Sequence, residues 1–257
     1  MRVERTAAGA AGTAGARWRR AGGAAALAIA AGYVATVALY AWVGAPPSTA
    51  EGWMAYLPGR TSAWWAIVAL SVATDLLYLP VALALHDALA VGHRATMALA
   101  AALVGLFVAL DLAVTWTNYT ALLSLGGDYA SAATGAARAA DLAAARYPAA
   151  VLASRLEAVY AIGILSLAVL AIGLVMRGSR FGPLAAYLGV ATGALGVLAL
   201  SGWGVAVILN ALCATAWLLV VGVRLALPGL RPATPTLGGG TGSGRPRGIA
   251  AEAARAG

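Results

Sequence analysis

The stretch SVATDLLYLPVALALHDAL, Ser71 to Leu89, is apolar enough to lie in lipid, yet it carries Asp75 near its middle and Pro80 shortly after. The apolar run around it, 64–85, is about as long as the ~20 residues that an α-helix needs to cross ~30 Å of hydrocarbon. A helix that is apolar on all sides belongs in a membrane or a deep core. The stretch therefore predicts a transmembrane helix that holds a carboxyl group inside the membrane.

The composition of the whole chain agrees with this prediction. Hydrophobic residues make up 62% of 257 positions and charged residues 10%, with a mean hydropathy of +0.85. An ordinary soluble domain is about 45–50% apolar and about 25% charged. No soluble fold buries that much apolar surface, so the sequence predicts an integral membrane protein whose main partner is the lipid bilayer.

The net charge of +8 is concentrated toward the two ends of the chain. Five of the 17 arginines precede the first apolar run and four follow the last one. Basic tails next to a membrane are attracted to anionic lipid headgroups, so the charge predicts headgroup contact and not nucleic-acid binding. The single cysteine, Cys213, cannot form an internal disulfide and is expected to be a small apolar residue.

Further apolar segments of similar length predict six transmembrane helices. Only helices and closed barrels satisfy their backbone in lipid, so the predicted fold class is all-α, a polytopic six-helix bundle over 24–224. The six predicted helices are 24–43, 64–85, 95–120, 150–176, 183–202 and 204–224. The turn from Ser201 to Gly204 is very short, and if it fails the last two helices merge into one.

Three segments flank or interrupt the predicted helices. The basic N-terminal tail, 1–23, precedes a first helix that is too long for a signal peptide and is expected to remain as an anchor. The Ala-rich outer loop, 126–148, could form an interfacial helix. The C-terminal tail, 225–257, is rich in Pro, Gly and Arg and is expected to be disordered.

The distribution of arginines predicts the orientation of the bundle. Thirteen arginines fall on the side of the N-terminus and three on the opposite side. Cytoplasmic segments carry an excess of Lys and Arg, so both termini are expected in the cytoplasm. The chain is then expected to be a multi-pass protein of the inner (cell) membrane. Tryptophans and tyrosines gather at the predicted outer boundary, where an aromatic belt is expected.

Four predicted helices carry a polar side chain at a similar depth in the outer half of the membrane. At a rise of ~1.5 Å per residue, Asp75 lies about 16 Å and Asp111 about 13 Å from the outer boundary. Glu157 and Asn210 lie about 10 Å and about 9 Å deep by the same rise. Arg155 is close to Glu157 in the chain. The sequence therefore predicts a polar layer inside the bundle.

Two helices place their polar residues on one face each. Ser71, Asp75 and Tyr78 return to nearly the same direction at ~3.6 residues per turn. Asp111, Thr115 and Asn118 follow an i, i+4, i+7 spacing and share a face of the next predicted helix. These faces are expected to meet in an interior seam.

Arg155 and Glu157 are two residues apart, so they point in roughly opposite directions. One arrangement has Arg155 reaching Asp111 while Glu157 faces Tyr160 and another helix. A carboxylate at a helix centre costs about 2.5–3.5 kcal/mol to insert, so such groups usually face a bundle interior or a water-filled cavity. The polar layer is then either a proton-binding cavity or a polar cluster that fixes helix packing.

The remaining motifs give no sign of enzymatic chemistry. The only histidines, His86 and His93, lie at the predicted inner end, far from Asp75, so we expect no metal site, no cofactor and no catalytic residue. Gly189 and Gly193 have the small-xxx-small spacing that lets helices approach closely. Pro80 is expected to kink its helix just below Asp75.

Three stretches resemble a bacterial family of six-helix membrane proteins, the family of domain of unknown function 4386. They are ATDLLYLPVALALHDAL, LFVALDLAVTW and GLVMRGSRFGPLAAYLGVATGALGVL, within a region from about Ala24 to Arg224. The matching positions are Asp75, then Arg177, Ser179, Phe181 and Pro183, and the glycines that follow. The resemblance implies fold and membrane location, and it implies no substrate or catalytic residue.

Two functions of different classes follow from the sequence. The favoured one is a structural or partner-binding membrane protein, with a second membrane protein or another copy of the chain as partner, because no paired repeats of the kind common in secondary transporters are evident. The alternative is a small proton-coupled permease or sensor. Its candidate titrating groups are Asp75, Asp111 and Glu157. The candidate buried polar or proton-binding residues for the two functions together are Asp75, Tyr78, Asp111, Asn118, Arg155, Glu157 and Asn210.

Overall fold

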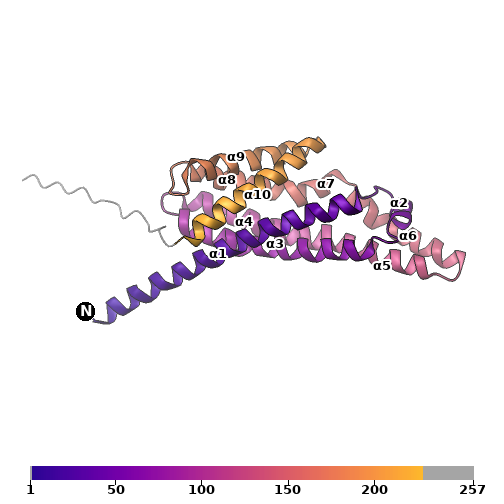
Figure 1. The fold of residues 1–257 in the computed structure, drawn as a ribbon, viewed down its shortest axis with the longest axis horizontal. Helices are drawn as coiled ribbons and strands as arrows, with labels where there is room; N and C mark the ends of the chain where they lie inside the picture. The colour runs from indigo at the N-terminus through magenta and orange to yellow at the C-terminus, as the bar shows by residue number, and fades with distance from the viewer. Residues whose placement is uncertain (1, 228–257) are drawn as a thin grey trace, which may run out of the picture.

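The protein is an all-α bundle in the computed structural model, which describes residues 2–227 and their side chains from Gly15 onward (Figure 1). No strand occurs in that range. The helical elements in chain order are α1 (Arg2–Val43), α2 (Ala50–Tyr56), α3 (Thr61–Leu89), α4 (Arg94–Leu110), η1 (Asp111–Trp116), α5 (Thr117–Ser131), α6 (Gly135–Leu152), α7 (Arg155–Ala158), η2 (Val159–Gly163), α8 (Ile164–Met176), α9 (Gly182–Ala199) and α10 (Gly204–Ala226).

Six stretches of helix among these elements are long and apolar enough to cross a membrane, which confirms the predicted fold class. Two of them combine elements that follow one another without a break in the helix. The spans are Gly15–Val43, Thr61–Leu89, Arg94–Ser131, Arg155–Met176, Gly182–Ala199 and Gly204–Ala226. Helices α9 and α10 are separate, because the chain turns at Gly202, whose φ of +85° is a conformation that glycine adopts readily.

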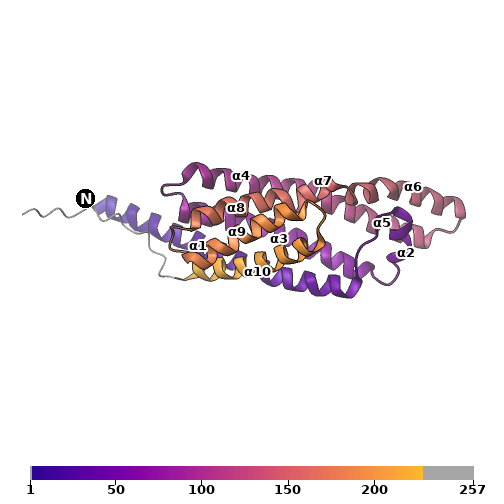
Figure 2. The ribbon, with the colours of Figure 1, turned by 90° about the horizontal axis from the view of Figure 1, so that it is seen from above.

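The long helix α1 packs against both α3 and α10, whereas α8 packs against α4 and α9 (Figures 1 and 2). The first residues of α1 and the last residues of α10 lie at the same end of the bundle (Figure 1). Arg19, His93 and Arg180 border one hollow there, so the start of the α1 span, the α3–α4 turn and the α8–α9 turn share that end. We call it the inner end; its cytoplasmic location remains a prediction.

Glycines bring α8 and α9 into close contact, as the spacing of Gly189 and Gly193 predicts. A Cβ atom on Gly189 would lie 3.0 Å from the Cα of Gly173 in α8. A Cβ atom on Gly193 would lie 2.7 Å from the backbone oxygen of Ser166. The two backbones therefore approach more closely than any larger residue would allow.

The predicted outer loop, 126–148, is helical over most of its length. Residues Gly126 to Ser131 complete α5, and α6 returns beside it as a helical hairpin (Figure 1). The hydroxyl oxygen of Thr134 accepts a hydrogen bond from the amide of Ala137 at 3.1 Å and begins α6. Helix α6 continues to Leu152, so the predicted fourth helix, 150–176, is divided by a break before α7.

Much of the predicted aromatic belt is instead a packed aromatic cluster at the outer end of the bundle. Trp53 and Trp64 are fully buried, with ring centroids 5.1 Å apart. Tyr119 stacks on Trp64 at 5.3 Å and on Trp116 at 5.4 Å. The exposed aromatic side chains include Trp42, which keeps the position expected at a membrane boundary.

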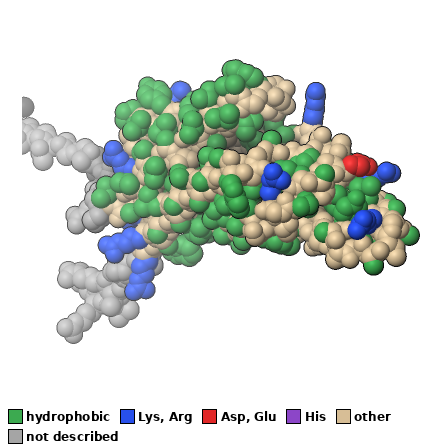
Figure 3. Space-filling model, turned by 45° about the vertical axis from the view of Figure 1, so that its right-hand side comes forward, with side chains coloured by type: hydrophobic (Ala, Val, Ile, Leu, Met, Phe, Trp, Pro, Cys, Tyr) green, Lys and Arg blue, Asp and Glu red, His purple; other side chains and the backbone are tan. Residues whose placement is uncertain are grey.

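The surface carries the pattern expected of a membrane protein. Figure 3 shows hydrophobic side chains across the middle of one face, with arginines clustered at its left-hand end and a few others toward the right. At the inner end, Arg19 and Asp87 form an ion pair at 3.0 Å between α1 and α3. Lipid contact along the apolar belt follows from the six spans. The predicted C-terminal tail lies almost entirely outside the described residues, which end at Leu227.

Candidate functional site

Three of the predicted acidic side chains line one cavity of about 210 Å³ inside the bundle. Asp75 comes from α3, Asp111 from η1 and Glu157 from α7. Asp75 and Asp111 retain only 5% and 3% of their surface exposed. The structure thus brings to one cavity the three carboxyl groups that were expected at a similar depth. We call this space the acidic cavity.

The hydrogen-bonding groups of the acidic cavity are only partly satisfied. The indole Nε1 of Trp116 donates to Oδ2 of Asp75 at 2.7 Å. Within the described residues, the buried Oδ1 of Asp111 and the Oγ1 of Thr115 have no hydrogen-bond partner. Buried polar atoms are nearly always paired, so the wall of the acidic cavity keeps hydrogen-bonding capacity that the described side chains do not use.

A π-helical segment explains how Trp116 reaches the acidic cavity. On a regular α-helix, residues 111 and 116 would point about 140° apart, at ~100° per residue. The wider π turn of η1 reduces that angle, and both side chains line the cavity. Such turns occur frequently at functional sites. A second π segment, η2, follows Glu157 on the facing helix.

The same π turn removes Asn118 from the predicted seam. Its Nδ2 donates to the backbone oxygen of Val114 at 2.6 Å, and the residue does not line the cavity. The Oγ1 of Thr117 donates to the backbone oxygen of Leu112 at 2.8 Å. Both side chains bond carbonyl groups of the π segment. The i, i+4, i+7 face expected for Asp111 and Asn118 is therefore interrupted.

Arg155 does not reach Asp111, contrary to the arrangement considered from the sequence. Its side chain is exposed, and the ion pairs among residues 15–227 join Arg19 to Asp87 and Arg146 to Glu51. The reason is local, because the chain breaks just before α7. There the Oγ of Ser154 accepts from the amide of Glu157 at 3.2 Å, and Glu157 is the residue turned toward the cavity.

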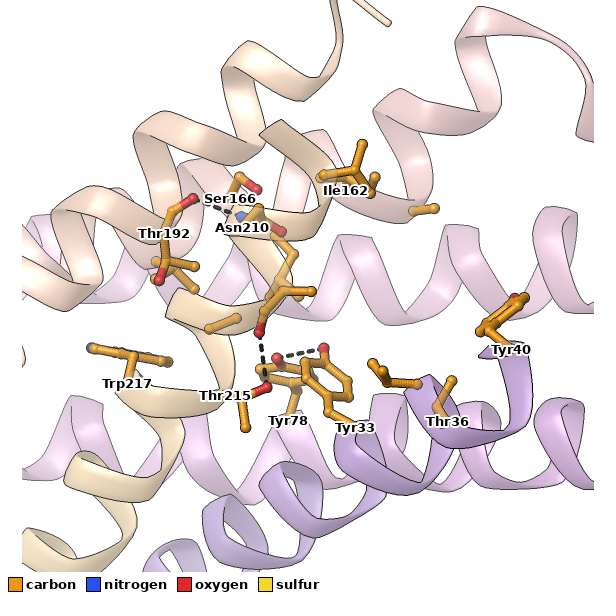
Figure 4. A pocket seen from close by; sticks show the side chains of 17 residues that line it. Tyr33, Thr36, Tyr40, Tyr78, Ile162, Ser166, Thr192, Asn210, Thr215 and Trp217 are labelled. Carbon is orange, nitrogen blue, oxygen red and sulfur yellow. Dashed lines mark hydrogen bonds between the residues drawn. The ribbon is translucent and has the colours of Figure 1, made fainter. Parts of the chain in front are cut away.

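A second and larger cavity, of about 330 Å³, lies between α1, α8, α9 and α10 (Figure 4). Most of its lining is apolar, so we call it the apolar cavity. Asn210 lines it and donates through Nδ2 to the backbone oxygen of Thr192 at 2.7 Å. Asn210 thus belongs to a different cavity from the acids with which it was grouped by depth.

The two cavities adjoin each other along α1. Four residues line both of them: Tyr33, Thr36, Tyr40 and Ala161. The hydroxyls of Tyr33 and Tyr78 hydrogen-bond at 2.7 Å, and either can be the donor (Figure 4). Tyr78 lines the apolar cavity, one helical turn from Asp75. This tyrosine pair therefore lies where the two cavities meet.

Sequence reasoning missed the contribution of α1 to this site. Tyr33, Thr36 and Tyr40 follow an i, i+3, i+7 spacing, which places them on one face of the first helix. That spacing was a signal that could have identified them. Trp116 had no such signal, because its position depends on the π turn.

The carboxyl groups of the acidic cavity are spread around its wall. Among the residues that the structure describes, no three His, Cys, Asp or Glu side chains converge closely enough to hold a metal ion. His86 and His93 line neither cavity. The three acids therefore surround a space and do not converge on a point.

Comparison of the chain with protein-family models, with curated proteins and with solved structures gave no match.

Proposed function

We propose that this multi-pass membrane protein binds protons in the acidic cavity and acts as a small proton-coupled permease or sensor. The observation that carries the proposal is the meeting of Asp75, Asp111 and Glu157 around one cavity. Within the described part of the chain, no arginine or histidine lines that cavity. Without a basic partner, a proton is the simplest group that can neutralise these carboxyls inside a membrane.

The structural alternative, favoured from the sequence alone, explains less of this geometry. A polar cluster that only fixes helix packing would be expected to pair its members with one another. Here, within the described residues, the one side-chain hydrogen bond of the cavity acids joins Trp116 to Asp75, and Asp111 and Thr115 each keep a buried atom without a partner. The close contact of α8 and α9 is made by glycines and does not use the acids.

The proposal also includes the membrane in which the protein lies and the family that it resembles. The excess of arginine at the inner end supports the inner membrane of a bacterial cell, with both termini in the cytoplasm. The resemblance to the family of domain of unknown function 4386 remains part of this proposal. It rests on Asp75 and on the segment that connects α8 to α9.

The experiment that tests the proposal detects proton binding directly. The full chain is reconstituted in lipid, and infrared difference spectra are recorded as the pH is changed. We expect a band from the carboxylic C=O stretch that weakens in Asp75→Asn and in Glu157→Gln. Asp128→Asn is the matched control, because Asp128 is an exposed acid on α5, and it should leave the band unchanged.

Two results separate the candidate functions. A folded wild-type protein without a titrating buried-carboxyl band contradicts proton binding and favours the structural role. If the band is present, proton flux is measured in liposomes that contain a pH-sensitive dye. Flux that is lost in Asp75→Asn and kept in Asp128→Asn identifies a permease, and a band without flux identifies a sensor.

A further inference from the structure

We propose that the ligand of this site is an amphipathic organic cation. Its apolar body would lie in the apolar cavity and its ammonium group at the acidic cavity. This inference rests on the proposed function, because the carboxyls that bind protons there would also bind the cation. It names the chemical class of substrate or signal that a permease or sensor of this kind would take.

The apolar cavity has the size and lining of a small-molecule site. Its volume of about 330 Å³ lies at the lower end of the roughly 300–1,000 Å³ range of ligand pockets. Leu165, Val169, Ala211, Ala214 and Trp217 give it apolar walls. The buried Oγ1 of Thr192 has no partner among the described residues and gives the wall a polar point.

The charge of the site favours a cation over an anion or a zwitterion. Three carboxyl residues line the acidic cavity, and no basic side chain from the described part of the chain lines either cavity. An anionic ligand would find no opposite charge. A phospholipid with an ammonium headgroup would bring a phosphate that no arginine could neutralise. A small amine brings only the charge that the site lacks.

Aromatic side chains make the junction between the cavities suitable for an ammonium group. Tyr33 and Tyr40 line both cavities, and Trp116 lines the acidic one. The faces of such rings attract cations. The hydroxyls of Tyr33 and Tyr78 provide hydrogen-bond acceptors at the same place.

The cation and protons would compete for the same carboxyls. The titratable groups that line the cavity with Asp75 come from four other elements, whereas α4 and η2 contribute only Phe107 and Ala161. These titratable groups are Tyr33 and Tyr40 from α1, Asp111 from η1, Tyr119 from α5 and Glu157 from α7. None of them carries a positive charge. Binding of one ammonium group should therefore displace bound protons, which is the exchange that a proton-coupled permease needs.

The apolar cavity opens toward the lipid-facing surface between α1 and α10. Val37 and Val207 line it, and they are 57% and 38% exposed. The helices meet at the inner end, where a Cβ on Gly23 would lie 2.8 Å from the backbone oxygen of Gly222. Farther out they separate around the cavity (Figure 4). An amphipathic amine already dissolved in the membrane could enter by this gap.

The test compares three probes of the same shape and different charge. Binding of adamantylmethylamine, adamantylmethanol and adamantanecarboxylate to the full chain in phosphatidylcholine nanodiscs is measured by calorimetry, with empty nanodiscs subtracted. We expect the amine to bind at least about tenfold more tightly than the alcohol, and the carboxylate to show no binding. Asp75→Asn and Glu157→Gln should each remove the preference for the amine, whereas Asp128→Asn should keep it.

A second pair of variants tests the apolar cavity. Ala211→Trp fills the cavity and should weaken both the amine and the alcohol by about tenfold or more, while the infrared carboxyl band remains. Leu212→Trp places the same ring on the neighbouring exposed position and should leave binding unchanged. If Ala211→Trp binds the amine like the wild type, the apolar cavity is not the site.

The other outcomes overturn the inference in distinguishable ways. Equal affinity for amine and alcohol would mean that the acids do not recognise the ligand. If the amine does not bind but the infrared carboxyl band is present, the cation ligand is refuted and proton binding stands. If neither amine binding nor the band is observed, both proposals are refuted. An affinity that falls when phosphatidylethanolamine replaces phosphatidylcholine would identify the primary ammonium headgroup of a lipid as the occupant and overturn the small-molecule assignment.

Discussion

Replacing Gly196 with alanine should destabilise the bundle, because α9 leaves no room for a methyl group where it meets α8 and α10. A Cβ atom there would collide with the Oγ of Ser166 and lie 2.6 Å from its Cβ, which the backbone of α8 holds in place. It would also lie 2.9 Å from Nδ2 of Asn210, whose hydrogen bond to the backbone oxygen of Thr192 joins α10 to α9.

The expected loss in the free energy of unfolding follows from two destabilising terms and one stabilising term. Overpacking costs about 1–3 kcal/mol, and disturbing the hydrogen bond of Asn210 costs about 0.5–1.5 kcal/mol. Alanine is a better helix former than glycine by about 1 kcal/mol. The net effect of Gly196→Ala is a loss of about 2 kcal/mol in the free energy of unfolding, opposite in sign to the effect of propensity alone.

The assay is reversible unfolding of the purified full chain in mixed micelles, driven by dodecyl sulfate and followed by tryptophan fluorescence. Gly105→Ala is the matched control, because Gly105 lies within α4 and an added Cβ would meet nothing within 4 Å. Gly105→Ala should leave the free energy of unfolding unchanged or raise it by up to about 1 kcal/mol. If both variants unfold at the same detergent fraction, the close packing at Gly196 is refuted.

Three further predictions concern single contacts and the orientation. Trp116→Phe leaves Oδ2 of Asp75 without its donor and should cost about 1–3 kcal/mol in the same assay; a change below about 0.5 kcal/mol would mean that another donor replaces it. Arg19→Ala removes an ion pair at the inner end and should cost less than about 1 kcal/mol, with a larger loss indicating a stronger role in packing α1 on α3. In a background without the native cysteine, Gly178→Cys should react with an impermeant thiol reagent only from the cytoplasm and Ala133→Cys only from outside, and the reverse pattern would invert the topology.

The sequence predicted the helices well because membrane insertion constrains length and composition together. The segment 183–202 and α9 differ by one residue at the start and three at the end. The largest differences lie outside the apolar runs, where α1 begins at Arg2 and not at residue 24 and where α2 and most of α6 form. There α2 and most of α6 are held by capping hydroxyls and aromatic packing, which hydropathy does not report.

The depth of the site residues along their helices was predictable from the sequence, but the direction in which each side chain points around the helix axis was not. Helical rise alone placed Asp75, Asp111 and Glu157 close enough to share a cavity. The predicted direction around the helix axis was wrong for Asn118 and missed Trp116, because the π turn Asp111–Trp116 changes which residues share a face. The position of Arg155 depends on the break before α7, where Ser154 caps the new helix, and such a local break interrupts the periodic pattern.

The contacts of α1 have a mechanical consequence. Its inner part is fixed on two sides, since Gly22 packs on Ala84 of α3 and Gly23 packs on Gly222 of α10, whereas its outer part lines both cavities. Farther out α1 stays packed on α3, since a Cβ on Gly32 would lie 2.6 Å from Cγ2 of Thr74 and the ring of Tyr40 lies 5.6 Å from that of Trp64. One wall of the lipid-facing gap is therefore held by α3 along its length. A change in the width of that gap has to come mainly from α10, the other helix that borders it.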